Sequence, residues 1–139
     1  RIGRLLGDFV ETHRLGVVLV GEVGVELGEN ILRAVDAAFI STETLARIEN
    51  LDKFLPLAPE LVVEIVSPGD TPGEVQDKLD LYLEAGTRMV WIVYPDLKKV
   101  VAHQADGRTQ SLGVGGRLEG GDVLPGLSLA VGEIFPEAD

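Results

Sequence analysis

The apolar and polar positions between residues 59 and 86 predict a buried strand, a turn and an amphipathic helix. The residues that recur at helical spacing and predict the buried face of the helix are Val75, Leu79, Tyr82 and Leu83. Residues 61–66 are apolar except for Glu64, and such a run is typical of a strand covered on both faces. A carboxylate buried among valines destabilises the fold unless it is paired, protonated or bound to a cation. Glu64 in this strand therefore requires a partner, a proton or a cation that compensates for its burial.

The helix that follows this strand has clear start and stop signals. The residues that provide them are the capping-box pair Thr71 and Glu74, Pro72 at the first helical position, and Gly86 at the end. Lys78 borders the buried face of the helix rather than facing open water. A short connection returns the helix beside the strand that precedes it, so we expect the ammonium group of Lys78 near Glu64.

The rest of the chain alternates between helical and strand-like patterns. Before the central strand, the predicted elements are a helix over 2–15 that ends at Gly16, a strand from 17 that continues or forms a hairpin through 30, a strand around 31–41, and a short helix beginning at Ser41 with a proline-bounded loop up to 59. After the central helix they are antiparallel strands at 88–96, 98–104 and 109–114, then a covering strand and terminal turn in 123–135. The order α-β-β-β-α-β plus C-terminal antiparallel strands predicts an α/β (α+β) fold. We expect a mixed β-sheet of at least four strands flanked by two long helices, with 61–66 as a central strand.

Length and composition narrow the class of protein. With 139 residues the chain is expected to form a single domain, residues 1–139. It has no cysteine, which excludes disulfides and thiolate metal sites. The apolar runs are too short to span a bilayer and no secretory signal is evident, so we expect no membrane partner and a cytoplasmic location. The net charge of -11 disfavours binding to the phosphate backbone of DNA, although divalent cations partly neutralise clustered carboxylates.

A second carboxylate lies inside an apolar strand. Asp36 is flanked by the apolar residues of 35–40, and it comes from the strand that precedes the one with Glu64. Carboxylates on adjacent strands can share Mg²⁺ or Mn²⁺, hard cations that prefer oxygen ligands, and the main-chain carbonyl of Ile65 is a candidate further ligand. A lysine such as Lys78 beside the metal can orient the attacking water and offset charge that develops on a phosphate.

Other residues with functional side chains have simpler interpretations. His13 lies on the apolar face of the first helix, which favours a hydrogen-bonded core or interface residue over a ligand. His103 is expected to be solvated near the end of a peripheral strand, and Glu22 to face solvent. Trp91 and Tyr94 are expected to be packing residues rather than platforms for stacked bases.

Several segments, in this order and spacing, resemble the Uma2 family, a branch of the PD-(D/E)XK nuclease superfamily with a restriction-endonuclease-like core. The segments are RAVDAAFI at 33–40, PELVVEIVSP at 59–68, DKLDLYLEAG at 77–86, VWIVYPD at 90–96 and VLPGL at 123–127. The resemblance covers nearly the whole chain. It implies that Asp36 and Glu64 are metal ligands, that Lys78 is the catalytic lysine, and that the chain is a Mg²⁺-dependent DNA endonuclease that acts through metal-activated water.

Two positions depart from the family pattern. The proline before the aspartate is Val35 here, which is not a ligand. The superfamily's usual lysine position, two residues after Glu64, is Val66, so the basic group depends on Lys78. The alternative interpretation is that Asp36 and Glu64 are structural and form ion pairs with Arg33 or Lys78. The chain would then be a non-catalytic binding or assembly module, for example a homodimer, and the residues that contact nucleic acid are not identified by the sequence.

Overall fold

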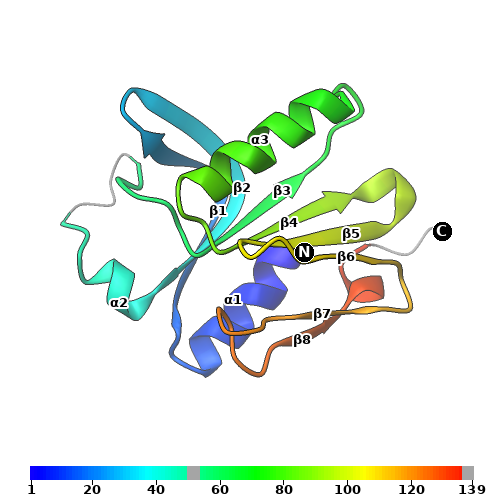
Figure 1. Cartoon of the computed structure of the whole chain (residues 1–139). Coiled ribbons are helices and arrows are strands. Elements are labelled where there is room, and N and C mark those ends of the chain that lie inside the picture. The colour runs from blue at the N-terminus through cyan, green and yellow to red at the C-terminus, as the bar shows by residue number, and fades with distance from the viewer. Residues whose placement is uncertain (50–53, 136–139) are drawn as a thin grey trace.

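The computed structural model describes residues 1–49 and 54–135, and it shows a mixed β-sheet with a long helix on each face (Figure 1). The strands of the main sheet are β1 (Gly16–Gly28), β2 (Ile31–Ser41), β3 (Leu61–Ile65), β4 (Met89–Tyr94), β5 (Lys99–Gln104) and β6 (Thr109–Leu112). The remaining elements are the helices α1 (Ile2–Thr12), α2 (Thr42–Leu45) and α3 (Pro72–Glu84), the short strands β7 (Arg117–Glu119) and β8 (Ser128–Ala130), and the 3₁₀ turns η1 (Pro95–Leu97) and η2 (Val131–Glu133). Within the described residues, no helix is both long and apolar enough to cross a membrane.

The main sheet has six strands in the order β1-β2-β3-β4-β5-β6. The pair β3–β4 is parallel and is connected through α3, whereas the other neighbouring strands are antiparallel. This arrangement confirms the predicted fold class, and it places β3 inside the sheet between β2 and β4. The residues after β6 form a separate two-stranded sheet of β7 and β8, a pairing that the sequence patterns did not indicate.

The sheet separates two apolar layers, and β3 contributes to both. Leu61 and Val63 point to the layer that α1 and the C-terminal segments cover, whereas Val62 points to the layer under α3. All three side chains have no exposed surface. The predicted coverage of this strand on both faces is therefore confirmed, and Glu64 is the polar residue at the end of the run that faces α3.

The helix α3 has the predicted start. Thr71 and Glu74 form a capping box in which each side chain accepts a hydrogen bond from the backbone N–H of the other residue. Pro72 is the first helical residue, and Gly86 follows the helix with a φ of 110°. These features fix the helix axis over the face of β3 and β4 and so determine which α3 side chains reach Glu64.

Helix α1 is shorter than predicted, because it ends at Thr12 rather than near Gly16. Arg14 adopts a left-handed φ of 54°, and the N–H groups of Arg14 and Leu15 return to the carbonyls of Glu11 and Val10. This is a Schellman arrangement with arginine in place of the usual glycine. Consequently His13 lies at the helix end, where its side chain is exposed rather than part of the core.

Two further expectations differ from the structure. Strand β5 is covered by β6 on its outer side, so His103 is half-buried and not on a peripheral strand. Strand β3 ends at Ile65, one residue earlier than predicted, although the N–H of Val66 still binds the carbonyl of Val93. The short helix does begin after Ser41, whose hydroxyl accepts a hydrogen bond from the Thr44 N–H, but part of the predicted loop lies outside the described residues.

Candidate functional site

The pairing of β2 with β3 brings Asp36 and Glu64 together. The last pair in the antiparallel register is Ala37 with Val63, and Asp36 and Glu64 are the next residues on the two strands. Residues that face each other across antiparallel strands project to the same side of the sheet. For this pair it is the side that α3 covers, because Glu64 contacts a side chain of that helix.

Asp36 is held by the backbone of the neighbouring strand. Its Oδ2 accepts a hydrogen bond from the N–H of Ile65 over 2.7 Å. The side chain of Asp36 is half-buried, so the carboxylate is accessible from outside the sheet. This contact is made by the N–H of Ile65 and does not involve its carbonyl oxygen. The role of that carbonyl oxygen as a metal ligand stays a prediction.

Glu64 is nearly enclosed and is held by a tyrosine. Glu64 is 7% exposed, and its Oε1 accepts a hydrogen bond from the hydroxyl of Tyr82 on α3. Tyr82 itself has no exposed surface. The apolar pattern assigned Tyr82 only to the buried face of α3. Since a buried tyrosine hydroxyl usually finds a partner, its place on that face was the available signal for a polar contact.

The surroundings of Glu64 change its acidity. Burial raises the pKa of Glu64 to about 7, and the negative charge of Asp36 raises it as well. The hydrogen bond from Tyr82 and the positive charge of Lys78 act in the opposite direction and lower the pKa of Glu64. Burial, followed by the bond to Glu64, also raises the pKa of Tyr82 far above its usual range, so this phenol keeps its proton at neutral pH.

Lys78 lies at the edge of the same site. It lines a cavity of about 10 Å³ beside Glu64, together with residues of β3, α3 and β4. Its charge affects the pKa of Glu64, yet among residues 1–49 and 54–135 no ion pair joins either carboxylate to a basic side chain. Arg33 is exposed and donates to the carbonyl of Leu32. The ion pairs with Arg33 or Lys78 that the alternative interpretation assumed are therefore absent among the described residues.

The donor set at this site fits a hard divalent cation. In the part of the chain that the structure describes, no group of three or more Asp, Glu or His side chains could hold a metal ion. Mg²⁺, however, commonly binds one or two carboxylates and retains several waters, which suits the pair of Asp36 and Glu64. The two acidic groups also repel each other when both are ionised, and a cation between them would relieve that repulsion.

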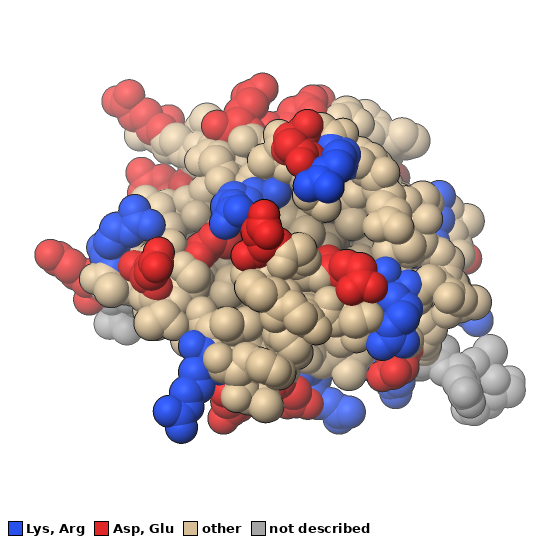
Figure 2. Space-filling model, turned by 60° about the horizontal axis from the view of Figure 1, so that its bottom comes forward, with Lys and Arg blue, Asp and Glu red and all other residues tan. Residues whose placement is uncertain are grey.

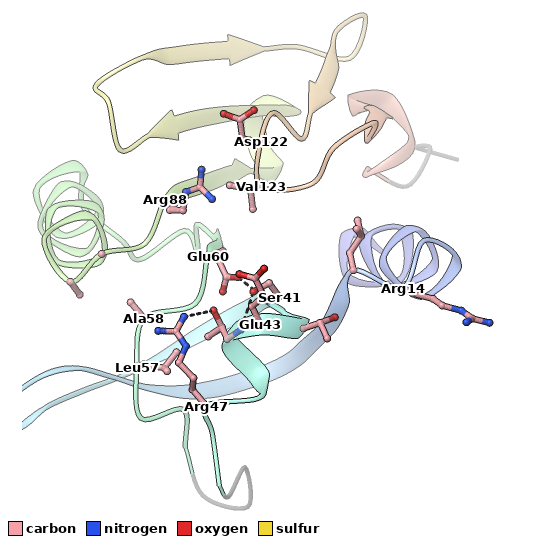
Figure 3. A pocket seen from close by; sticks show the side chains of 15 residues that line it. Arg14, Ser41, Glu43, Arg47, Leu57, Ala58, Glu60, Arg88, Asp122 and Val123 are labelled. Carbon is pink, nitrogen blue, oxygen red and sulfur yellow. Dashed lines mark hydrogen bonds between the residues drawn. The ribbon is translucent and has the colours of Figure 1, made fainter.

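A larger hollow, of about 730 Å³, lies at the opposite end of β3 (Figure 3). In it, Glu60 accepts a hydrogen bond from the N–H of Ser41 with Oε2, while its buried Oε1 has no partner among the described residues. Arg47 donates to the hydroxyl of Thr44, and Arg88 and Asp122 also line the hollow. The residues that line this hollow include no pair of carboxylates on adjacent strands comparable to Asp36 and Glu64.

The comparisons with known proteins give this chain a family and a fold. The chain belongs to the Uma2 family, whose model, described as "Putative restriction endonuclease", matches residues 1–132. Among solved structures, a crystal structure of a putative nuclease belonging to DUF820 from Anabaena variabilis superposes with a TM-score of 0.83. It is 19% identical in sequence, and the match covers 96% of this chain and 75% of that one. A comparison with curated proteins finds no match. The resemblance to Uma2 is thus confirmed, and the likeness to the solved structure supports the fold.

Proposed function

We propose that this chain is a metal-dependent phosphodiesterase that cuts DNA at the site formed by Asp36, Glu64 and Lys78. The observation that carries the proposal is the pair of carboxylates on adjacent strands, one of them with a pKa raised to about 7. Strongly shifted acidic groups that lie together are a common sign of a functional site. Membership of a family described as putative restriction endonucleases agrees with this chemistry.

Each residue has a distinct role in this proposal. Asp36 and Glu64 bind Mg²⁺ or Mn²⁺ through carboxylate oxygens, with the carbonyl of Ile65 as a further ligand. The cation, when bound, supplies Lewis-acid activation of water and of the phosphate. Lys78 presents its ammonium group to the negative charge that develops on the phosphate during hydrolysis, because its charge already acts on the same carboxylate.

A plasmid assay tests this function. We expect the purified protein to nick supercoiled DNA with Mg²⁺ or Mn²⁺ and not with EDTA. The variants Asp36→Asn and Glu64→Gln should lose nicking and Mn²⁺ binding together. Matched controls are Asp106→Asn and Glu119→Gln, which make the same chemical changes at exposed positions outside β2, β3 and α3. Equal nicking by all four variants would show that the reaction does not use this site.

A second candidate function is a non-catalytic binding or assembly module, for example a homodimer, that keeps the nuclease fold. Two observations favour it: Glu64 is nearly enclosed, and the net charge is -11. On the face shown in Figure 2, basic side chains alternate with acidic ones and form no continuous basic area that would suit a DNA backbone. This candidate predicts no metal-dependent nicking of any DNA tested, together with a dimer in sedimentation measurements.

A further inference from the structure

Tyr82 connects the helix α3 to the candidate metal site through one hydrogen bond. Its ring is completely buried in the layer between α3 and the sheet, and its hydroxyl donates to Oε1 of Glu64. The backbone carbonyl of Tyr82 accepts a hydrogen bond from the N–H of Thr87, which anchors this last turn of the helix. The packing of the ring and the hydrogen bond at the backbone of Tyr82 therefore both restrict the position of the hydroxyl.

We infer that Tyr82 is a positioning residue that orients the Glu64 carboxylate for binding a divalent cation. The inference rests on the proposed function, and it assigns a role to a residue that is not itself a ligand. Oε1 is engaged by Tyr82, and the strand register places Asp36 next to Glu64, so a cation between them would use the second oxygen of Glu64, Oε2. A carboxylate fixed in this way loses less conformational freedom when it binds a metal than one on a free side chain.

Asp36 is held in a comparable way. Its Oδ2 accepts a hydrogen bond from the N–H of Ile65. Each carboxylate thus has one oxygen held by a donor from the protein, and the two side chains lie within hydrogen-bonding reach of each other. The two bound oxygens use donors from different elements, a backbone N–H of β3 and a side chain of α3, so they can be changed independently.

A purely structural role for Tyr82 makes a different prediction. If the hydroxyl served only to satisfy a buried carboxylate, its removal would change the stability of the fold and leave cation affinity as in the parent. If it orients Glu64, Tyr82→Phe should weaken Mn²⁺ binding roughly 10- to 100-fold, the usual effect of removing a residue that supports a metal ligand.

The chain offers a matched control, because it contains two tyrosines. Tyr94, at the end of β4, is half-buried, and Tyr94→Phe removes the same hydroxyl group outside the site. Calorimetric titration of Mn²⁺ should give parent-like affinity for Tyr94→Phe and weak affinity for Tyr82→Phe, with the same circular dichroism spectrum for both. Affinity of Tyr82→Phe within twofold of the parent would overturn the inference.

A second measurement needs no change at Tyr82. In protein labelled with ¹³C at the tyrosine Cζ atom, two signals are expected, and Tyr94→Phe assigns them. Adding Mg²⁺ should shift the Tyr82 signal and leave that of Tyr94 in place, with the midpoint that a calorimetric titration of Mg²⁺ gives. An unmoved Tyr82 signal during demonstrated Mg²⁺ binding contradicts the inference alone. If the parent binds neither cation, the proposed function fails instead.

Discussion

The N–H of Ile65 donates a hydrogen bond to Oδ2 of Asp36 over 2.7 Å, so a side chain continues the contact between β2 and β3 beyond their last backbone pair. The next neighbouring N–H along the strand, that of Val66, points the other way and binds the carbonyl of Val93 on β4. Asp36 thus occupies the place that a backbone carbonyl of β2 would take in a regular ladder. The same carboxylate that is a candidate metal ligand therefore also helps to hold the end of β3.

This dual role gives a prediction for two changes at Asp36. Asp36→Asn keeps an oxygen that can accept the Ile65 N–H, so its free energy of unfolding should stay close to that of the parent. Asp36→Ala leaves that N–H without its partner and should lose about 1 kcal/mol. Urea unfolding of the three proteins measures the difference. Equal stability of Asp36→Ala and the parent would mean that water replaces the carboxylate without loss.

Glu64 should make the stability of the fold depend on pH. Its pKa is raised from 4.5 to about 7 in the folded protein, so the folded state binds the proton more tightly than the unfolded state. The stabilisation from this proton is complete below about pH 4.5 and is lost as the pH rises through about 7. The shift corresponds to about 3 kcal/mol in the free energy of unfolding.

The variant Glu64→Gln isolates this effect, because an amide cannot ionise and still accepts the Tyr82 hydroxyl. We expect Glu64→Gln to be close to the parent in stability near pH 4.5 and more stable than the parent by up to about 3 kcal/mol at pH 8. Urea unfolding of both proteins across this range provides the comparison. A stability difference that stays constant with pH would show that Glu64 ionises normally in the fold.

A change at Lys78 distinguishes an active nuclease from a protein that keeps the nuclease fold without the activity. Lys78→Met keeps most of the side-chain packing and removes the ammonium group, so the variant should fold and still bind Mn²⁺. Nicking of supercoiled DNA should slow by roughly 10²- to 10³-fold, the usual effect of removing one group that stabilises charge in a transition state. Lys98→Met, at the exposed turn before β5, is the control. Equal rates for Lys78→Met and the parent would remove Lys78 from the mechanism.

The fold was largely predictable because its main elements carry local signals. The apolar run before and after Glu64 predicted a strand covered on both faces, and the Thr71–Glu74 capping box predicted the start of α3 correctly. The end of α1 was not predictable in this way. It depends on the left-handed backbone conformation of Arg14. Glycine usually occupies such a position, because its lack of a side chain removes the steric penalty, so an arginine there does not indicate a helix end in the sequence.

The candidate site was predictable in part. The out-of-place charges at Asp36 and Glu64 identified the two strands, and the register of β2 with β3 does place them together. The contact between Tyr82 and Glu64 was missed because it depends on how α3 is rotated over the sheet, which the periodicity of one helix does not determine. For the same reason the sequence predicted Lys78 near Glu64 but not whether the two would form an ion pair.

The central claim, a cation site between Asp36 and Glu64, is tested most directly by anomalous diffraction from crystals soaked in Mn²⁺. We expect one anomalous peak within bonding distance of a carboxylate oxygen of Asp36 and one of Glu64, and no such peak in soaked crystals of Glu64→Gln. A Mn²⁺ peak bound elsewhere on the chain, or no peak between these two residues at a concentration that saturates binding in solution, would contradict it.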